Sequence, residues 1–345
     1  MSALAVLILL MGVCGACRAP EPVAWNRFEF QQIQMGLLFR LVVWARDGST
    51  ATNASVAAFQ RVQGLNTLLS DYEEQSELSR LSRTSGSGQW VRVSDELWRV
   101  LKRGDAISRA SSGSFDVTVG PLIQVWRRAR RQREMPTQEK IQRAQASVGW
   151  QHIRFDERAR SVQLDLPEMR LDLGAIAKGY ALDEVGRVMR AHGIRRFLVA
   201  GAGDLVVGEP PPGLAGWKIE VAPLDSPGAP PPRDVLLRNA SLCTSGDLFQ
   251  HVEIEGKRYS HIVDPRTGLG LTDHSLVTVI GPDAMTTDAL ATAVSVAEPE
   301  LGLALVRRFG ADVLVVRRPE GKLEEHATSG FWRWQTRRRD SLNAP

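Results

Sequence analysis

The apolar residues of this chain repeat with two different periods. Alternation of apolar and polar residues over 28–45, 153–166 and 251–263, each interrupted by a turn, predicts three β-hairpins. Stretches with the helical period of 3.6 residues lie between and after these hairpins. Because hairpins join antiparallel strands, the pattern argues against an all-parallel sheet. We predict a mixed α/β (α+β) fold with largely antiparallel sheets, helices packed on the outside and two intimate lobes.

Several helices are predicted from capping residues and apolar spacing. Asn53 is the expected N-cap of one helix, and Ser94 begins another. Further helical patterns cover 121–133, 137–148 and 298–309. Five arginines on the first of these three are interpreted as a solvent-exposed face: Arg127, Arg128, Arg130, Arg131 and Arg133.

Composition is that of a globular protein, with 43% apolar and 24% charged residues among 345. This length suits one large domain or two closely packed lobes. The formal net charge of +4 is small, and no block of Lys and Arg alternates with aromatic residues in the folded region. Nucleic acid is therefore not an expected partner.

The first residues have the pattern of an export signal. An apolar run over 4–13 is too short for a mature membrane helix and leads into Cys14-Gly15-Ala16-Cys17. The small-small-Cys ending is typical of a lipoprotein signal, although Cys14 stands where Leu or Val is usual. A metal or redox site at these cysteines is disfavoured, because Cys243 is the only other cysteine.

We therefore expect residues 1–17 to form a signal peptide whose Cys17 is lipidated and becomes the first mature residue. The protein would then be exported and anchored through this lipid to the periplasmic face of a bacterial membrane. The basic tail over 331–345 has few core-forming residues, so we expect it to be flexible and to contact anionic lipid.

One acidic residue and one hydroxyl-bearing residue on the same predicted helix suggest a cation site. After the turn at 281–283, Asp288 and Thr292 fall four residues apart, one above the other on the helix surface. A carboxylate and a hydroxyl so placed suit Mg²⁺, which takes oxygen ligands and leaves room for substrate phosphates. The alternative is that Asp288 is a solvated helix residue and Thr292 packs against the preceding turn.

A histidine stands at a predicted strand end. His261 closes the strand that leads into the Asp264-Pro265 turn, a position from which a rigid scaffold can aim a side chain. Its imidazole could take a proton from an attacking hydroxyl or bind a phosphate. In the alternative interpretation it is a buried histidine that is hydrogen-bonded to Asp264.

Two glycine-containing stretches complete the candidate chemistry. The segment 113–122 either joins two elements or presents Asp116 and nearby backbone amides to a ligand. Over 170–185, a predicted strand passes through Gly174 into a helix, which exposes backbone N–H groups to an anion, with Lys178 one turn in. This stretch lacks the spacing of a P-loop, and 200–204 runs on into a strand rather than the helix of a dinucleotide fingerprint.

Taken together, these segments resemble the ApbE-type flavin transferases, and they follow one another in the order of that family. They span about three quarters of the chain. The matching segments are 35–36, 69–80, 113–122, 171–183, 200–204, 244–247, 260–268 and 287–293.

The resemblance implies an ApbE-like domain over 28–330 and the activity of a Mg²⁺-dependent FAD:protein FMN transferase. Such an enzyme binds FAD as substrate and transfers its FMN half to a Thr or Ser hydroxyl of an acceptor redox protein, with release of AMP. Similarity places His261 near the transferred phosphate, and we expect it to be the base. The resemblance also implies that Asp288, Thr292 and the backbone carbonyl of Ala175 bind the metal. The positions implied for the flavin nucleotide site are Met35, Tyr72, Ser114, Phe115, Asp116, Asp172, Lys178 and Val263.

Two departures from the family pattern bear on FAD affinity and turn geometry. Leu37 stands where Thr commonly follows Met-Gly, which removes a hydroxyl from the nucleotide site, and Ala202 replaces a usual glycine.

Two alternatives to the transferase remain open. One is a metal-dependent FAD pyrophosphatase that releases FMN and AMP to water, and the other is a periplasmic FAD-binding lipoprotein that does not transfer.

Overall fold

A large antiparallel sheet forms the centre of this computed structural model, which describes residues 24–247 and 250–335. Its eight strands lie side by side in the order in which they occur along the chain, and every neighbouring pair is antiparallel. The strands are β1 (Asn26–Gln34), β2 (Leu37–Ala45), β6 (Arg196–Gly201), β7 (Asp204–Val207), β10 (Ala240–Gly246), β13 (His274–Gly281), β14 (Asp312–Arg318) and β15 (Glu324–Ala327).

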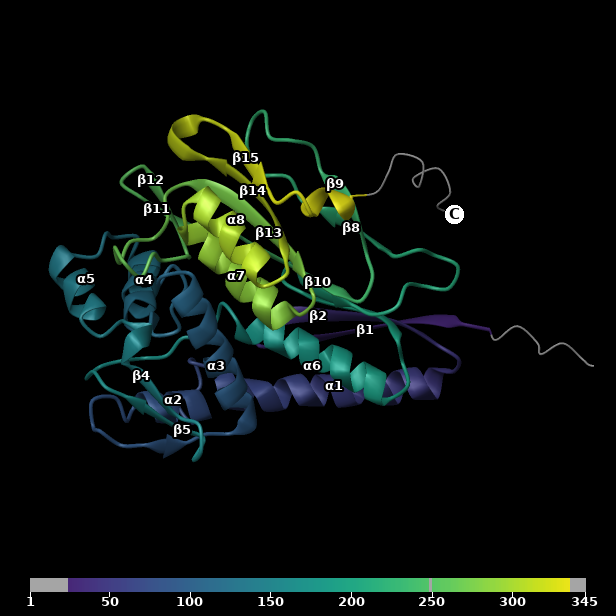
Figure 1. The fold of residues 1–345 in the computed structure, drawn as a ribbon, viewed down its shortest axis with the longest axis horizontal. Coiled ribbons are helices and arrows are strands. Elements are labelled where there is room, and N and C mark those ends of the chain that lie inside the picture. Colours follow the sequence, from purple (N-terminus) through teal and green to yellow (C-terminus); the bar gives the residue numbers. More distant parts are fainter. Residues whose placement is uncertain (1–23, 248–249, 336–345) are drawn as a thin grey trace, which may run out of the picture.

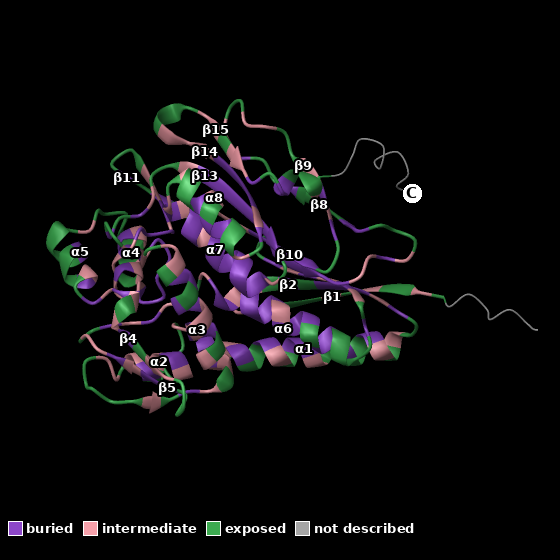
Figure 2. Cartoon of the chain, in the orientation of Figure 1, coloured by how far each residue is buried: buried purple, intermediate pink, exposed green. Residues whose placement is uncertain are grey.

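Both faces of this sheet are covered at its centre, which explains why inner strands such as β13 and β14 are nearly continuous apolar runs, whereas the edge strand β1 alternates. In β2, Leu41 and Val43 belong to the core on the helix side, whereas Val42 belongs to the core on the opposite side. Figure 1 shows the helices along one face, and Figure 2 shows how much of the sheet and of α7 is buried. The covering helices are α1 (Gly48–Leu69), α6 (Ala177–Ala191), α7 (Ala284–Val296) and α8 (Pro299–Arg308).

The opposite face is closed by a hairpin and by the end of the described chain. The hairpin consists of β8 (Trp217–Val221) and β9 (Arg233–Leu237), and Trp217 and Val235 lie in the second core. A further hairpin, β11 (His251–Ile254) with β12 (Lys257–Ser260), lies next to α4 in Figure 1.

A second, smaller lobe is inserted between β2 and β6. It contains a three-stranded antiparallel sheet in the order β3-β5-β4, with helices around it (Figure 1). Its elements are α2 (Glu77–Ser82), β3 (Val91–Arg92), α3 (Asp95–Ala110), α4 (Gly120–Gln132), α5 (Gln138–Gln145), β4 (Ile153–Asp156) and β5 (Ser161–Leu164). The predicted α+β fold with antiparallel sheets, and all three predicted hairpins, are confirmed.

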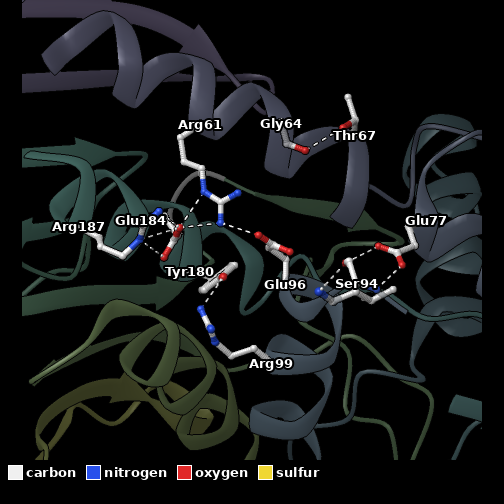
Figure 3. A network of polar contacts seen from close by, with 11 residues as sticks. Arg61, Gly64, Thr67, Glu77, Ser94, Glu96, Arg99, Tyr180, Glu184 and Arg187 are labelled. Carbon is white, nitrogen blue, oxygen red and sulfur yellow. Dashed lines mark hydrogen bonds and ion pairs between the residues drawn. The ribbon is translucent and has the colours of Figure 1, made fainter. Parts of the chain in front are cut away.

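A charged network joins the helices of the large sheet to the smaller lobe (Figure 3). Arg61 of α1 donates to Glu184 of α6 at 2.8 Å and to Glu96 of α3 at 2.9 Å. The Glu184 side chain is only 6% exposed and also pairs with Arg187, 61% exposed, at 3.0 Å. Burial would raise the pKa of Glu184, but hydrogen bonds from Arg187 and Arg61 outweigh it and lower that pKa. Arg61 is therefore the link between three helices.

Two predictions about element ends are wrong. The first helix begins at Gly48, because the Asp47 carboxylate accepts a hydrogen bond from Thr50 N at 2.7 Å and acts as the N-cap in place of Asn53. The described part of the tail is packed rather than flexible. Phe331 is fully buried, and the Trp334 carbonyl accepts a hydrogen bond from Leu236 N at 2.7 Å.

The predicted signal peptide with Cys14 and Cys17, and residues 336–345 of the basic tail, lie outside the described residues. No helix within the described residues is long and apolar enough to cross a membrane.

Candidate functional site

The site is built where α6 crosses α7 with almost no separation. A Cβ atom placed on Gly179 would lie 2.1 Å from the Ala284 carbonyl oxygen and 2.9 Å from Asp288 Cβ. Only glycine permits this approach, because any other side chain would overlap the backbone of α7. As a consequence, Gly179 N–H reaches Asp288 Oδ2 and donates to it at 3.0 Å.

Three charged side chains meet at this crossing. Lys178 forms an ion pair with Asp204 of β7, and its Nζ lies 3.8 Å from Asp288 Oδ1. Both carboxylates are buried. Burial raises the pKa of Asp288 to about 6, against the opposing effect of Lys178. Burial acts to lower the pKa of Lys178, but the two carboxylates outweigh it and raise that pKa above its ordinary value. The cluster therefore carries net negative charge, which favours a cation.

Oxygen atoms suited to a hard cation surround this cluster. Thr292 lies one turn beyond Asp288 on α7, and its hydroxyl is 3.4 Å from that of Ser245 on β10. Gly179 N–H donates to Asp288 rather than to the carbonyl of Ala175 four residues earlier, which leaves that carbonyl available. Carboxylate, hydroxyl and carbonyl oxygens are the ligands that Mg²⁺ prefers. The residues predicted to hold the metal thus have the right chemistry, although no cluster of three acidic, histidine or cysteine side chains suited to a metal occurs in the described ranges.

His261 follows the end of β12, as predicted, and its side chain is partly buried. Its Nδ1 lies 3.0 Å from the Gln250 carbonyl, which can only accept a hydrogen bond, so Nδ1 carries the proton and Nε2 is left basic. Burial lowers the pKa of His261, and the charges of Arg130 and Lys178 lower it further. The alternative pairing with Asp264 is not formed, because that carboxylate accepts from Arg266 at 2.9 Å.

A second group gathers around Arg127 of α4. Its guanidinium donates to Asp71 at 2.5 Å and to Asp172 at 3.1 Å, and it lies 4.1 Å from the centre of the Tyr72 ring. Burial and the nearby Asp71 raise the pKa of Asp172, while Arg127 opposes them. Tyr72 is 75% exposed, so its ring lies over Arg127 with its other face open to solvent. The prediction that all five arginines of this helix form a solvated face is wrong for Arg127 and Arg130, which are both partly buried.

The loop around Asp116 is fixed from within. Asp116 Oδ1 accepts from the N–H and the hydroxyl of Thr118, at 2.8 and 2.7 Å, and Oδ2 accepts from Trp150 N at 2.9 Å. Burial raises the pKa of this carboxyl against these hydrogen bonds. Because three hydrogen bonds engage its oxygens inside the protein, the Asp116 side chain holds the loop.

This loop lies beside Asp172, which brings two predicted segments together. Asp172 N donates to the Val117 carbonyl at 2.8 Å, and Val119 pairs with Arg170 in an isolated parallel bridge. The predicted strand ending at 171–173 is reduced to this contact. Asp172 Oδ1 then accepts from Gly174 N at 2.8 Å, so the turn into α6 is shaped by the same carboxylate.

The remaining residues predicted for the flavin site are held in position by apolar packing or burial. Ser114 and Phe115 are buried in the loop, and Val263 is buried in a small core beside α4. Met35 has a positive φ of 51° in the turn between β1 and β2, and its side chain packs partly buried against the main core. Sequence reasoning did not assign a role to Asp204, Ser245 or Arg127. Asp204 had a usable signal, since it directly follows the tight turn at Ala202 and Gly203, both at positive φ.

A cavity of about 430 Å³ lies away from these residues. It is lined by residues of α3 and α6, by the turn before α7 and by the ends of β7 and β10 opposite to those that carry Asp204 and Ser245. None of the predicted site residues lines it. The convergence of buried charge on Asp288 and Lys178, rather than this cavity, identifies the candidate site.

Known proteins resemble this chain over most of its length. A model of the ApbE family matches residues 35–315. The FAD:protein FMN transferase of Salmonella typhimurium is 31% identical over 348 residues, which cover 96% of this chain and 94% of that protein. The Escherichia coli K12 protein of the same name is 30% identical over 326 residues, with coverage of 90% and 91%.

Solved structures give the same result. The flavin transferase ApbE from Vibrio cholerae superposes with a TM-score of 0.81 at 26% identity, over 90% of this chain and 100% of that chain. The apo flavinyl transferase ApbE of Pseudomonas stutzeri has a TM-score of 0.78 at 29% identity, over 90% and 97%.

Proposed function

This chain belongs to the ApbE family and is a FAD:protein FMN transferase, and from that premise we propose that it joins FMN to a Thr or Ser hydroxyl of an acceptor redox protein. The bond formed is a phosphoester, AMP is the second product and Mg²⁺ is the metal ion. The observation that supports this most directly is the cluster of Asp288 and Lys178, with Thr292 one turn beyond, in which the charge of Lys178 lowers the pKa of His261.

His261 is the base in this proposal. The acceptor hydroxyl oxygen attacks the phosphorus of the FMN half, its proton passes to His261 Nε2, and the bond between that phosphorus and the AMP oxygen breaks with its electron pair on AMP. The Gln250 carbonyl holds the Nδ1 proton and so keeps Nε2 free for this task. Burial keeps the imidazole neutral before the reaction, as a base must be.

Asp288, Thr292 and the Ala175 carbonyl would hold Mg²⁺, which when bound neutralises charge on the pyrophosphate oxygens. Lys178 offsets part of the negative charge of the two buried carboxylates, and its Nζ lies 3.8 Å from Asp288 Oδ1. Gly179 N–H fixes the second oxygen of Asp288. Oδ1, which accepts no hydrogen bond within the described residues, would be the Asp288 oxygen free to bind the ion.

In this proposal Tyr72 lies on the exposed side of the nucleotide site, and Asp172 lies on its buried side. The open face of the Tyr72 ring offers a stacking surface to an aromatic ligand, and Asp172 offers an acceptor to ring N–H or ribose hydroxyl groups. Met35, Ser114, Phe115, Asp116, Lys178 and Val263 complete the set assigned to FAD by similarity. The Asp116 carboxylate contributes by holding its loop.

The test is incubation of the purified protein with FAD, Mg²⁺ and a candidate acceptor, followed by intact-mass measurement of the acceptor. A gain equal to one FMN on the acceptor, with an equal amount of AMP in solution, is the expected result. Release of FMN and AMP without any gain in mass would indicate a pyrophosphatase instead. Binding of FAD without cleavage would indicate a carrier.

A further inference from the structure

The arginines of α4 fall into two groups that face different surroundings. Arg128, Arg131 and Arg133 are exposed, whereas Arg127 and Arg130, three residues apart on one face, are partly buried. The rotation of α4 is fixed by Trp126, whose Nε1 donates to the Gly268 carbonyl at 2.8 Å and whose ring lies 5.2 Å from that of Tyr259. Arg127 on the inner face reaches Asp172, so this face of α4 points at the candidate site.

The two inner arginines differ in what they contact. The Arg127 side chain is 19% exposed, and two carboxylates and the Tyr72 ring occupy its guanidinium. For Arg130, by contrast, no ion pair or hydrogen-bond partner is formed within residues 24–247 and 250–335. A guanidinium has five N–H donors in a rigid fork. Those of Arg130 are left for a ligand.

Arg130 also lies between the two halves of the site. It lies three residues along α4 from Arg127, whose guanidinium contacts the Tyr72 ring and Asp172, and its own charge is close enough to His261 to lower the pKa of that imidazole. Burial lowers the pKa of Arg130, the response expected of a cation that is partly removed from water without a carboxylate beside it. A negatively charged ligand that spans from Tyr72 to His261 would supply the missing partner.

The charges of the cluster formed by Lys178, Asp204 and Asp288 also favour Arg130 as the cation that binds phosphate. Lys178 is balanced by Asp204 and Asp288, so it is not available as a free cation for phosphate. The pyrophosphate of FAD would enter beside two buried carboxylates that repel it. Arg130 is the inner-face cation that is free to offset that repulsion, and its planar fork matches phosphate oxygens.

We propose that Arg130 binds the pyrophosphate of FAD and that Arg127 is a positioning residue that holds Tyr72 and Asp172 around the flavin nucleotide. This assignment rests on the proposed function, because it takes FAD as the ligand. Arg127 acts through its contacts at 2.5 Å with Asp71 and 3.1 Å with Asp172 and through its stacking under Tyr72.

The test of Arg130 compares Arg130→Gln with Arg131→Gln, its exposed neighbour on the same helix. The dissociation constant of FAD is measured by titration over a range of salt concentrations. Loss of a charge-assisted hydrogen bond should weaken binding about 10- to 100-fold in Arg130→Gln and flatten its salt dependence, with melting temperature unchanged. Arg130→Lys should recover part of the affinity, and Arg131→Gln should match the parent.

Equal FAD affinity in Arg130→Gln and the parent, or equal losses in the two glutamine variants, would overturn the assignment to Arg130. A parent protein that transfers FMN while Arg130→Gln binds FAD normally refutes this inference alone. A folded parent that does not bind FAD refutes the proposed function and this inference together.

The test of Arg127 uses a variant pair. Arg127→Gln should raise the KM for FAD about 10-fold or more with little change in kcat, and it should also lower the melting temperature, because Asp71 and Asp172 are left facing each other. Adding Asp71→Asn removes that repulsion and should restore the melting temperature but not the KM. Arg128→Gln is the exposed control. Recovery of both quantities in the double variant would show that Arg127 only stabilises the fold and would overturn the positioning role.

Discussion

His261 combines a fixed proton on one ring nitrogen with a lowered pKa on the other. The Gln250 carbonyl determines the tautomer at 3.0 Å, and burial disfavours the charged imidazolium. An unperturbed histidine has a pKa of about 6.5, so the lowered pKa keeps His261 neutral at pH 7. The side chain is therefore ready to accept a proton without first losing one.

We predict that the transfer rate rises with pH through a midpoint below 6.5 and stays level above it, because the neutral form predominates above the pKa. Asp264 does not counteract this lowering, because its carboxylate is paired with Arg266. His261→Asn should reduce transfer by about 10²- to 10⁴-fold and retain FAD binding. Rate profiles and flavin titration on the same samples measure both. Near-parental transfer by a stable Asn variant would exclude His261 as the base.

The ionised form of Asp288 lowers the stability of the metal-free protein, although the same form is needed to bind the metal. Its pKa of about 6 lies above the unfolded value of about 3.9. In metal-free protein, its favourable contribution to stability is present below pH 3.9 and is lost as the pH rises through 6, at a cost of up to about 3 kcal/mol. Asp288→Asn should lack this loss, so above pH 6 its unfolding free energy should equal or exceed that of the parent.

The same Asn substitution, and Asp288→Ala, should abolish Mg²⁺-dependent turnover, whereas Thr292→Ala should have a milder effect. Chemical denaturation at pH 4 and pH 7 and turnover against Mg²⁺ concentration are the measurements. Ser295→Ala, elsewhere on α7, is the control because its hydroxyl bonds only the preceding turn. Full turnover of Asp288→Ala at low Mg²⁺ would contradict the metal assignment.

Local spacing could predict some of these residues and not others. Asp288 and Thr292 share a helix face, and Lys178 follows a glycine entry, so neighbours in sequence suffice to suggest them. Asp204 and Arg127 acquire their roles from partners far along the chain, at Lys178 and at Asp71 and Asp172. Without knowledge of the tertiary contacts, an arginine-rich helix is expected to be solvated.

At the scale of elements, the site depends on how closely α6 and α7 approach. Gly179→Ala would place a Cβ atom 2.1 Å from the Ala284 carbonyl oxygen, so the helices must separate. We predict a loss of about 1–3 kcal/mol in unfolding free energy and a larger loss of turnover, because Asp288 moves with α7. Gly64→Ala in α1 is the control. It meets no atom within 4 Å, and it should add up to about 1 kcal/mol through helix propensity.

Urea denaturation and turnover of both alanine variants measure this difference. A Gly179→Ala protein that is as stable and as active as the parent would show that neither stability nor turnover requires the close crossing of α6 and α7.

Hairpins were the elements best predicted from sequence, because period two and a turn residue mark them locally. The β1–β2 turn at Met35 and Gly36, both at positive φ, is one example. Helix starts were less certain, since Asp47 and Asn53 are both capable caps and only the fold selects one of them. The strand expected to end at 171–173 is reduced to one isolated bridge, between Val119 and Arg170, because the partner segment passes into α4 at Gly120.

At the scale of the whole molecule, Arg61 holds the smaller lobe to the helices of the large sheet (Figure 3). Arg61→Met leaves the buried Glu184 with the exposed Arg187 alone, and we predict a loss of about 3 kcal/mol at pH 7. The pKa of Glu184 is lowered in the fold, so this stabilisation is present above its unfolded pKa of about 4.3 and is lost as the pH falls through the folded pKa.

Thermal melts of Arg61→Met at pH 7 and at pH 3 should therefore differ from the parent at the first pH far more than at the second. Arg187→Gln, at an exposed position, should cost less than about 1 kcal/mol. A loss that is equal at both pH values would assign the effect to packing of the Arg61 side chain rather than to its charge.

Localisation remains a prediction from the sequence. If Cys17 carries the lipid, Cys17→Ser should release the protein from membranes and leave its transfer rate unchanged. Fractionation of cells that express both forms, followed by activity measurement on the released protein, tests this. A serine variant that stays with the membrane would indicate an uncleaved N-terminal anchor.

The order of strands in the large sheet has a consequence for how quickly its parts can assemble. Strands β13, β14 and β15 follow one another closely along the chain and can pair early. The pairing of β2 with β6, in contrast, must close a loop that contains residues 46–195, including the whole smaller lobe. Loop closure costs entropy before the contacts form, and distant pairings are slow. We therefore expect the C-terminal half of the sheet to gain protection from hydrogen exchange before the β1–β2 hairpin joins it, so that the hairpin that carries Met35 docks onto the sheet last.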